Sequence, residues 1–422
     1  MELLDGYEIL LGTYEAFLLG YQAKPLEYMG KELSSKRELR TSFANHAHSA
    51  SVRSIVAGDK YLVSAGGDEN VKIFNLRNRT EHGALNHSDG VINCMLFYDK
   101  RHLITASEDG KICILKTNSG WNVEKTLSKH KAGVTDLALH PSGKLMLSIG
   151  KDAKLITWNL IKGRSAYITN LHENADFVRW SPSGNYYVVG FFKRLDIYSV
   201  STAAIEISFP FPGRLNDVVF LDDVTIAVAG EMSQIEIHSI VSKTLIMKFE
   251  AHTNRVRCMT LLSSENQSKG GSNDQCLVTA SNDGLVKVWK LQKTSLQSSD
   301  PTKGSSFDFT FDVVEEGKVD TKSRITCLKV HKVPQVITET TTTHTKQDAQ
   351  NTASNNEIKK KKARIQIDEP LEEHSEPSSK NNIKKPKITI EDEMVKSIEN
   401  EGTEKDKEVR TKKTKKQKKR SL

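Results

Sequence analysis

The chain has 422 residues, a formal net charge of +8 and five cysteines scattered through apolar runs. Isolated cysteines in an odd number argue against a disulfide framework or a zinc site, and they suit buried thiols in a reducing compartment. The longest apolar run, residues 186–192, is too short to span a bilayer, and no basic-then-apolar signal sequence opens the chain. We therefore expect a soluble intracellular protein.

Two strand-like segments, residues 7–13 and 16–22, come first and are joined by a turn at Tyr14 and Glu15. Residues 38–43 would form an outer strand of the same unit. In a four-stranded unit with strands a to d, counted from the inside, these segments are strands b, c and d. The missing strand a must come from elsewhere in the chain.

A strand, a tight polar turn and a second strand then recur along the chain, with the clearest copy at residues 277–291. Related segments lie at residues 64–74, 105–115 and 148–158. The turns of successive copies are centred on Asp68, Asp109, Asp152, Phe192, Met232 and Asp283, and the copies at Phe192 and Met232 are degenerate. A period of about 40 to 45 residues with four strands per repeat is the signature of a β-propeller. The last interval is longer because of a polar loop at residues 263–274.

Residues 324–330 resemble the inner strand at residues 255–260 and can supply the strand that the first unit lacks. We predict an all-β fold, a seven-bladed β-propeller over residues 1–335. Blade seven would be shared by residues 7–43 and 324–330, so that the ring is closed by segments from both chain ends and no inner edge stays open. Residues 307–313 would form strand d of blade six.

Residues 336–422 are rich in Thr, Asn, Lys and Glu and nearly free of aromatic side chains, which predicts a disordered tail. Two basic runs stand out in it: Lys359, Lys360, Lys361, Lys362 and Arg364, and then Lys412, Lys413, Lys415, Lys416, Lys418, Lys419 and Arg420. Such runs suit nuclear import or contact with RNA phosphates, which do not exclude each other. A tail that only improves solubility is the plainer alternative.

Four repeats carry the same polar set, a His before strand a, a hydroxyl in strand b, the turn Asp and an aromatic residue in strand c. The sets are His48, Ser64, Asp68 and Phe74; His87, Thr105 and Asp109; His130, Ser148, Asp152 and Trp158; and His252, Thr279, Asp283 and Trp289. A hydrolase would show such a set once, whereas a recurring set resembles the structural hydrogen-bond network of WD repeats. Because Phe74 and Leu115 cannot donate, the networks of blades one and two should be shorter.

No motif for catalysis or for a cofactor is found. The chain lacks a Walker loop, a dinucleotide fingerprint and a nucleophile elbow. His46 and His48 lack a third metal ligand nearby, and the repeat network already uses His48. We expect no enzyme activity, no cofactor, no metal and no small-molecule substrate.

The d-to-a loops and b-to-c turns lie on one face of a propeller, and loops on a rigid scaffold carry recognition. The residues expected on this partner-binding face are Glu69, Asp89, Glu108, Lys131, Lys151, Asn254, Arg255 and Asn282.

Several fragments are more specific than a generic repeat, among them EHGAL at residues 81–85, HPSGKL at 140–145, WSP at 180–182 and AVAG at 227–230. Over roughly residues 5–333 they resemble the WD-repeat family of PAK-kinase-interacting proteins and the fungal maintenance-of-killer (Mak) ribosome-assembly factor. The resemblance implies a non-catalytic scaffold for large (60S) ribosomal subunit biogenesis in the nucleus and nucleolus. Its partners would be ribosomal proteins or assembly factors of the pre-60S particle, with rRNA contacted through the tail.

Two alternatives remain. The same resemblance implies negative regulation of PAK-type kinases by direct binding in some members. A ubiquitin-ligase substrate receptor ranks lower, because that class usually carries Trp-Asp-x-Arg after strand c, whereas Trp158 is followed by Asn159 and Trp289 by Lys290.

Overall fold

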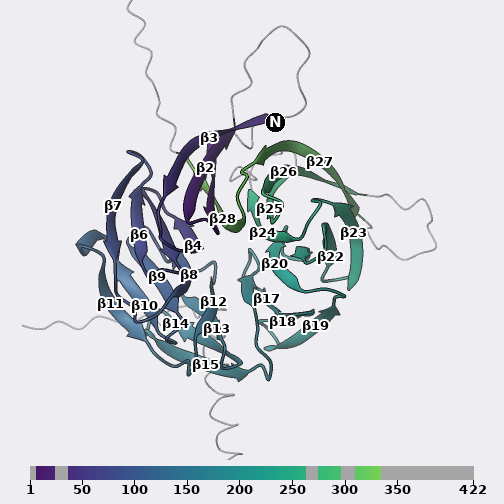
Figure 1. Cartoon of the computed structure of the whole chain (residues 1–422). Coiled ribbons are helices and arrows are strands. Elements are labelled where there is room, and N and C mark those ends of the chain that lie inside the picture. Colours follow the sequence, from purple (N-terminus) through teal and green to yellow (C-terminus); the bar gives the residue numbers. More distant parts are fainter. Residues whose placement is uncertain (1–5, 24–36, 263–273, 296–308, 334–422) are drawn as a thin grey trace, which may run out of the picture. The chain divides into compact units, whose positions relative to one another are not determined.

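Residues 6–23, 37–262, 274–295 and 309–333 are described by the computed structural model, and all of them belong to one compact unit. They form seven four-stranded antiparallel blades arranged in a ring (Figure 1). The predicted all-β seven-bladed propeller is therefore confirmed. The two basic runs of the tail and most of the polar loop predicted at residues 263–274 lie outside the described residues.

The strands of each blade run from the centre of the ring outwards, as strands a, b, c and d. Blade one contains β4 (Val52–Ala57), β5 (Tyr61–Gly66), β6 (Val71–Asn75) and β7 (Thr80–Leu85). Blade two contains β8 (Ile92–Phe97), β9 (His102–Ser107), β10 (Ile112–Lys116) and β11 (Asn122–Leu127), with a 3-10 turn at Thr117–Ser119. Blade three contains β12 (Val134–Leu139), β13 (Leu145–Gly150), β14 (Lys154–Asn159) and β15 (Arg164–Asn170).

The other four blades follow the same order. Blade four contains β16 (Phe177–Trp180), β17 (Tyr186–Gly190), β18 (Arg194–Ser199) and β19 (Ala204–Pro210). Blade five contains β20 (Leu215–Phe220), β21 (Thr225–Gly230), β22 (Gln234–Ser239) and β23 (Thr244–Glu250). Blade six contains β24 (Val256–Leu262), β25 (Asp274–Ser281), β26 (Leu285–Ser295) and β27 (Phe309–Asp320). Blade seven contains β28 (Ile325–Lys332), β1 (Tyr7–Thr13), β2 (Phe17–Ala23) and β3 (Arg37–His46).

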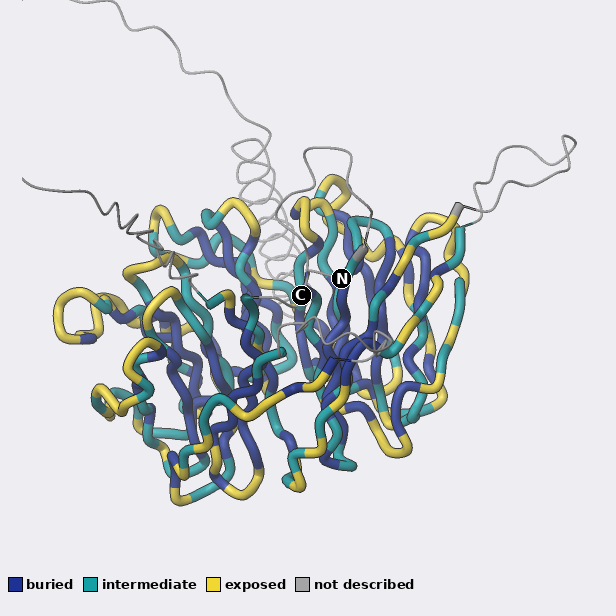
Figure 2. Tube along the Cα trace, turned by 90° about the horizontal axis from the view of Figure 1, so that it is seen from above, coloured by how far each residue is buried: buried dark blue, intermediate teal, exposed yellow. Residues whose placement is uncertain are grey.

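Burial explains why the middle strands read as nearly continuous apolar runs. Each blade packs between two others, so both faces of a middle strand are covered, and every residue of β13 is buried. The outer strand β15 of the same blade has no buried residue and is much more polar. Figure 2 shows the exposed residues gathered mainly in the loops that connect the strands.

Six of the seven innermost strands carry a β-bulge. The pairing with strand b skips one residue in each, and the skipped residues are Arg53, Asn93, Thr135, Asn216, Arg257 and Thr326. All six line a central hollow of about 750 Å³. A bulge redirects a side chain that would otherwise follow the strand's alternation. The bulges therefore give the hollow a lining of polar side chains.

Blade seven is built from two distant parts of the chain, because β28 pairs antiparallel with β1 from Tyr7–Lys332 to Thr13–Ile325. The predicted strand at residues 307–313 is too short, since β27 continues to Asp320. Its far end pairs in parallel with β3, at Gly317–Arg37 and Lys318–Glu38. A Cβ at Gly317 would lie 3.1 Å from the Arg37 carbonyl oxygen, so glycine permits this approach.

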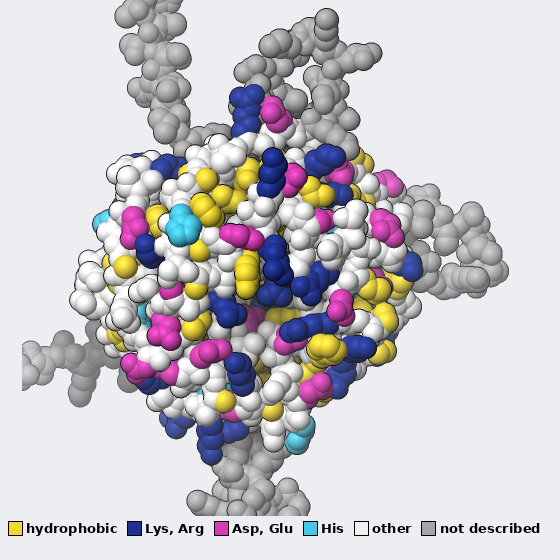
Figure 3. All heavy atoms as spheres, in the orientation of Figure 1, with side chains coloured by type: hydrophobic (Ala, Val, Ile, Leu, Met, Phe, Trp, Pro, Cys, Tyr) yellow, Lys and Arg dark blue, Asp and Glu magenta, His cyan; other side chains and the backbone are white. Residues whose placement is uncertain are grey.

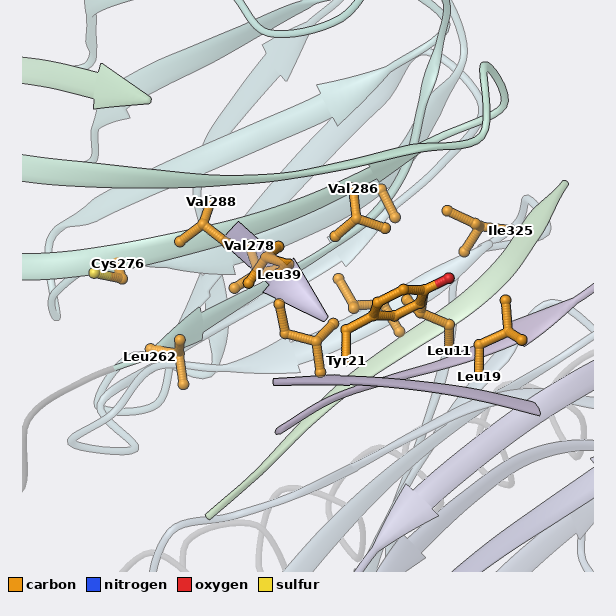
Figure 4. Close-up of a cluster of buried hydrophobic side chains, with 13 residues drawn as sticks. Leu11, Leu19, Tyr21, Leu39, Leu262, Cys276, Val278, Val286, Val288 and Ile325 are labelled. Carbon is orange, nitrogen blue, oxygen red and sulfur yellow. The ribbon is translucent and has the colours of Figure 1, made fainter. Parts of the chain in front are cut away.

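Blades six and seven also share one hydrophobic core (Figure 4). Val278, Val286 and Val288 of blade six pack in the same cluster as Leu11 and Tyr21 of blade seven. Burial of such side chains stabilises by about 1.5–3 kcal/mol each. The closing blade is thus held by apolar packing as well as by strand pairing.

A buried carboxylate joins blade seven to blade one. Glu8 in β1 is fully buried, and its Oε1 lies 2.7 Å from Nη1 of Arg79, in the c-to-d turn of blade one. Ser42 in β3 also donates to Glu8. The Arg79 guanidinium lies 5.2 Å from the ring centroid of Phe43. The charge is therefore paired across the junction where the chain ends meet the first complete blade.

Replacing Arg79 by Ala should lower the free energy of unfolding by about 2–4 kcal/mol, because Glu8 would remain buried without its cation. Urea unfolding followed by tryptophan fluorescence measures this. The control is Arg40→Ala, which removes an exposed ion pair with Glu38 and should cost at most about 0.5 kcal/mol. Equal losses in the two variants would refute a role for Glu8 and Arg79 in holding the ring closed.

Candidate functional site

The polar set of blade three forms a complete network. His130 contacts the Asp152 carboxylate through Nδ1 at 2.9 Å and the Ser148 hydroxyl through Nε2 at 2.7 Å. The Trp158 indole donates to the same hydroxyl at 2.8 Å. These four residues tie the loop before strand a to strands b and c of the same blade.

Blade six, whose sequence copy is the clearest, is connected less tightly. His252 contacts the Thr279 hydroxyl at 2.8 Å, and the Trp289 indole donates to that hydroxyl at 3.0 Å. Nδ1 of His252 lies 3.4 Å from an Asp283 oxygen, and it makes no hydrogen bond to any described residue. Asp283 accepts from Thr253 and from the Leu285 amide instead.

The networks of blades one and two are shorter. In blade one His48 reaches Asp68 at 3.0 Å and Ser64 at 2.8 Å, while buried Phe74 contributes only packing. In blade two His87 contacts Thr105 at 2.8 Å.

Asp109 of blade two makes no hydrogen bond to His87. It accepts from Ser107 and from the Lys111 amide. Nδ1 of His87 has no hydrogen-bond partner within the described part of the chain.

Burial and hydrogen bonding fix the charges in these networks. Burial lowers the pKa of His48, His87 and His130, and it lowers the pKa of His252 to about 4. These imidazoles are therefore neutral at pH 7.

The pKa of each turn carboxylate is lowered as well, although burial alone would raise it. Burial alone would raise the pKa of Asp152, but the hydrogen bonds from the Lys131 amide and His130 outweigh it, and the pKa lies below its usual value. The pKa of Asp68, Asp109 and Asp283 is also lowered against the effect of burial, chiefly by hydrogen bonds and, for Asp68 and Asp283, by the neighbouring His.

The networks hold loop backbones and leave adjacent side chains exposed. The Ser49 amide donates to Asp68 at 3.0 Å and the Lys131 amide to Asp152 at 3.0 Å, although the Lys131 side chain faces solvent. A recognition surface whose backbone is already fixed loses less conformational entropy on binding. The arrangement therefore suits binding of another macromolecule at this face.

The structure places all eight residues of the predicted partner-binding face on the d-to-a loops and b-to-c turns. Four of them are exposed: Glu69, Lys131, Asn254 and Arg255. The backbone amide of Asn282 donates to the carbonyl oxygen of Arg255 at 3.3 Å. The other three are in ion pairs: Asp89 with Lys111 at 2.9 Å, and Glu108 with Lys151 of the next blade at 3.0 Å. The charges of Asp89, Glu108 and Lys151, which lie in the loops of blades two and three, are thus neutralised by ion pairs.

The degenerate turns of blades four and five carry no such network. In blade four Phe192 is 51% exposed at the turn, and the Arg214 guanidinium lies 5.5 Å from its ring centroid. In blade five Glu231 follows β21 and accepts from the Arg214 amide at 3.3 Å.

Sequence reasoning missed a charged cluster in the wall of the central hollow. Arg179 of blade four lies beside Asp136 of blade three and 3.1 Å from Asp217 of blade five. Each carboxylate also accepts from a backbone amide of another blade, Asp136 from Val178 and Asp217 from Met259, both at 3.0 Å. Burial alone would lower the pKa of Arg179, but the two carboxylates raise it.

Two bulge residues also link blades. Asn93 donates to the Val134 carbonyl oxygen at 2.9 Å and Asn216 to the Val256 carbonyl oxygen at 2.7 Å. Asn or Asp recurs near the start of strand a, in Ile92-Asn93, Thr135-Asp136 and Asn216-Asp217, and this recurrence could have identified these contacts from the sequence.

The two histidines considered as metal ligands lie in different environments. His46 is exposed and packs edge-on against Phe17 with centroids 4.9 Å apart, whereas His48 is buried in the blade-one network. Burial raises the pKa of Cys94, Cys258, Cys276 and Cys327, which keeps these thiols protonated. In the described ranges no three His, Cys, Asp or Glu side chains group as metal ligands. The same ranges contain no helix long and apolar enough to cross a membrane.

Comparison with known proteins gives matches to WD repeats and to kinase-interacting proteins. The WD domain, G-beta repeat family matches residues 80–115, 121–159 and 243–290. The p21-activated protein kinase-interacting protein 1-like of Danio rerio is 36% identical over 77% of this chain and 81% of its own length. Its Gallus gallus counterpart is 38% identical over 68% and 72%. Protein MAK11 of Saccharomyces cerevisiae is 25% identical over 68% and 78%.

Ser148 and Ser64 offer a matched test of the networks. Both are fully buried, but Ser148 serves His130 and Trp158 whereas Ser64 serves only His48. Ser148→Ala should lower the free energy of unfolding by about 2–3 kcal/mol and Ser64→Ala by about 1 kcal/mol less, since one fewer buried donor is left unpaired. Thermal or urea unfolding would measure both, and a larger loss for Ser64→Ala would contradict the assignment.

Stability should fall as pH is lowered from about 6.5 to 4. In this window the unfolded chain protonates His252 while the folded chain does not, because its pKa is lowered to about 4. The contribution is complete above pH 6.5 and amounts to about 3 kcal/mol at most for this residue.

Urea unfolding of the wild type and of His252→Asn at several pH values measures the effect. The slope of stability against pH should be shallower in the variant, and the exposed His172→Asn variant should keep the wild-type slope. Identical slopes in all three proteins would contradict the assignment.

Proposed function

Because the chain belongs to the WD-repeat family of p21-activated protein kinase-interacting proteins, we propose that it is a non-catalytic platform for assembly of the large ribosomal subunit. Its propeller binds ribosomal proteins or assembly factors of the pre-60S particle through the face of d-to-a loops and b-to-c turns. The scaffold role is supported by the WD-repeat architecture and by the interacting-protein names of the relatives.

The observation that carries the proposal is the way the networks hold the loops. The repeated His, Ser or Thr, and Asp residues form networks whose carboxylates accept hydrogen bonds from loop amides such as those of Ser49 and Lys131. The adjacent side chains remain exposed. A fixed backbone that presents varied side chains is a surface for specific protein recognition. The recurring residues hold the scaffold, and the residues between them select the partner.

The ribosomal assignment rests on the family resemblance of the sequence and on the similarity to Protein MAK11 of Saccharomyces cerevisiae. The basic runs at residues 359–364 and 412–420 fit it, since positive charge favours nuclear import and contact with RNA phosphates. We assign the protein to the nucleus and nucleolus on the same grounds. The tail then retains the propeller near pre-ribosomal RNA.

Binding to a PAK-type kinase is the second candidate. The observation in its favour is the name of several relatives, p21-activated protein kinase-interacting protein 1, and of Shk1 kinase-binding protein 15 in Schizosaccharomyces pombe. In this role the propeller would bind a regulatory segment of the kinase without needing the tail. Regulation by direct binding and ribosome assembly would then use the same scaffold.

Depletion of the protein followed by profiling of ribosomal subunits tests the first role. The ratio of large to small subunits should fall, because a platform for large-subunit assembly would be missing. Expression of the full chain should restore the ratio. Expression of residues 1–338 should restore it only in part, since the basic runs that deliver the propeller would be absent.

Two further arms separate the candidates. A full chain with Lys131→Glu and Asn254→Glu, both exposed on the partner-binding face, should fail to restore the ratio. A chain with Lys116→Glu at the end of β10 and Lys243→Glu in the c-to-d turn of blade five should restore it. An unchanged subunit ratio after depletion, together with tail-independent pull-down of a PAK regulatory segment, would reject the ribosomal role in favour of kinase binding.

A further inference from the structure

Positive charge gathers where the central hollow opens towards the d-to-a loops. Arg53 and Arg257 lie at the second position of β4 and β24, directly after those loops. Lys329 lies three residues beyond the bulge residue Thr326 of β28 and therefore deeper in the hollow. All three are exposed and line the hollow. Arg214 in the loop before β20 also lines it, but its guanidinium is paired with Asp176 at 3.3 Å. Figure 3 shows Lys and Arg side chains around the hollow at the centre of the ring.

The bulge position shows that two of these arginines are not required by the repeat. At this position Asn93, Asn216 and Thr326 donate to carbonyl oxygens of Val134, Val256 and Gly12. These side chains therefore have a structural role in their blades. The equivalent Arg53 and Arg257 form no hydrogen bond or ion pair with any residue in the described part of the chain.

Arg53 and Arg257 differ from several other cations on this face. Lys111, Lys151 and Arg214 are neutralised by Asp89, Glu108 and Asp176. Arg53 and Arg257 have no such partners within the described ranges. Unpaired like charges around one hollow repel one another and lower stability. Such a cost is typical of a surface kept for a ligand.

We infer that the mouth of the hollow between blades five and one binds an acidic segment of a partner protein. Carboxylates of the segment would pair with Arg53 and Arg257 at the mouth and with Lys329 deeper in the hollow, while Arg214, paired with Asp176, lies at the edge of the site towards blade five. Arginine favours this role because its planar guanidinium can bind a carboxylate with two parallel hydrogen bonds. The inference deepens the proposed function and rests on its assignment of this face to partner binding.

The size of the hollow favours a peptide over a nucleic acid duplex. The hollow of about 750 Å³ is large enough for an extended segment and its side chains, whereas a nucleic acid duplex is about 20 Å wide and cannot enter.

Aromatic side chains at the edge of the face offer apolar contacts for the same segment. Tyr14 is 57% exposed in the turn between β1 and β2, and the Arg324 guanidinium lies 4.9 Å from its ring centroid. Phe192 and Arg214 form a similar pair in blade four at 5.5 Å. Tyr, Phe and Arg are enriched at protein interfaces. The face thus combines a cationic centre with arginine-aromatic pairs at its edge.

The test uses the full-length protein and a fluorescent peptide of alternating Asp and Glu with a central benzoylphenylalanine. Fluorescence anisotropy measures binding, and photo-crosslinking with mass spectrometry locates it. The wild type should bind with an affinity that falls as salt is raised. Crosslinks should lie in the loops and inner strands of blades five, six, seven and one.

Arg53→Asn with Arg257→Asn places at each bulge the residue that blades two and five carry there, so the double variant should fold. It should bind the peptide roughly tenfold more weakly, since each exposed charge pair contributes up to about 1 kcal/mol. The control, Lys116→Asn with Lys243→Asn, removes the same charge from the end of β10 and from the c-to-d turn of blade five, and it should bind as the wild type does.

Three results would overturn the inference. The first is crosslinking confined to the basic runs of the tail, and the second is equal weakening in the control variant. The third is displacement of the peptide by a single-stranded RNA of equal charge at lower concentration than by unlabelled peptide. None of these readouts involves ribosomes, so each result leaves the subunit profile as an independent test of the proposed function.

Discussion

Closure of the ring is the constraint on which this structure depends. A blade buries its faces only against neighbouring blades, and an open ring would leave an unpaired inner strand edge and two uncovered sheet faces. The pairing of β28 with β1 removes the open edge. The parallel contact of β27 with β3, the shared core of blades six and seven, and the Glu8 to Arg79 ion pair strengthen the same region. Strand pairing, apolar packing and an ion pair thus all stabilise the blade in which the two distant parts of the chain meet.

The hydrogen-bond networks are graded around the ring. Blade three has four connected members, blade six lacks the hydrogen bond between His and Asp, blade one lacks the indole, and blade two keeps only the contact between His and hydroxyl. Even in blades one and two the turn carboxylate still fixes loop amides, those of Asn70 and Lys111. Local loop order therefore survives loss of single members, because the carboxylate has several donors available.

The β-bulges of the inner strands have two roles, because some bulge residues link strands and others present a charge to the hollow. A bulge aims a side chain at the central hollow in six blades. Asn93, Asn216 and Thr326 there tie strands together, while the two arginines stay unpaired within the described residues. The cluster of Arg179 with Asp136 and Asp217 holds blades three, four and five on the other side. The ion-pair cluster of blades three to five and the unpaired arginines of blades six and one thus occupy different sectors of the same lining.

The sequence by itself determined the repeat, the number of blades, the origin of the closing strand and the candidate members of the polar sets, because each follows from local periodicity. It also named the residues on the loop face, since strand order decides on which face a turn lies. Three features were decided only by the tertiary structure: the length of β27 and its contact with β3, the incomplete network around His252 despite the best sequence copy, and the pairing of Arg179 with carboxylates about 40 residues away on either side. They depend on how the blades are placed against one another, and sequence spacing carries no information about distances across a ring.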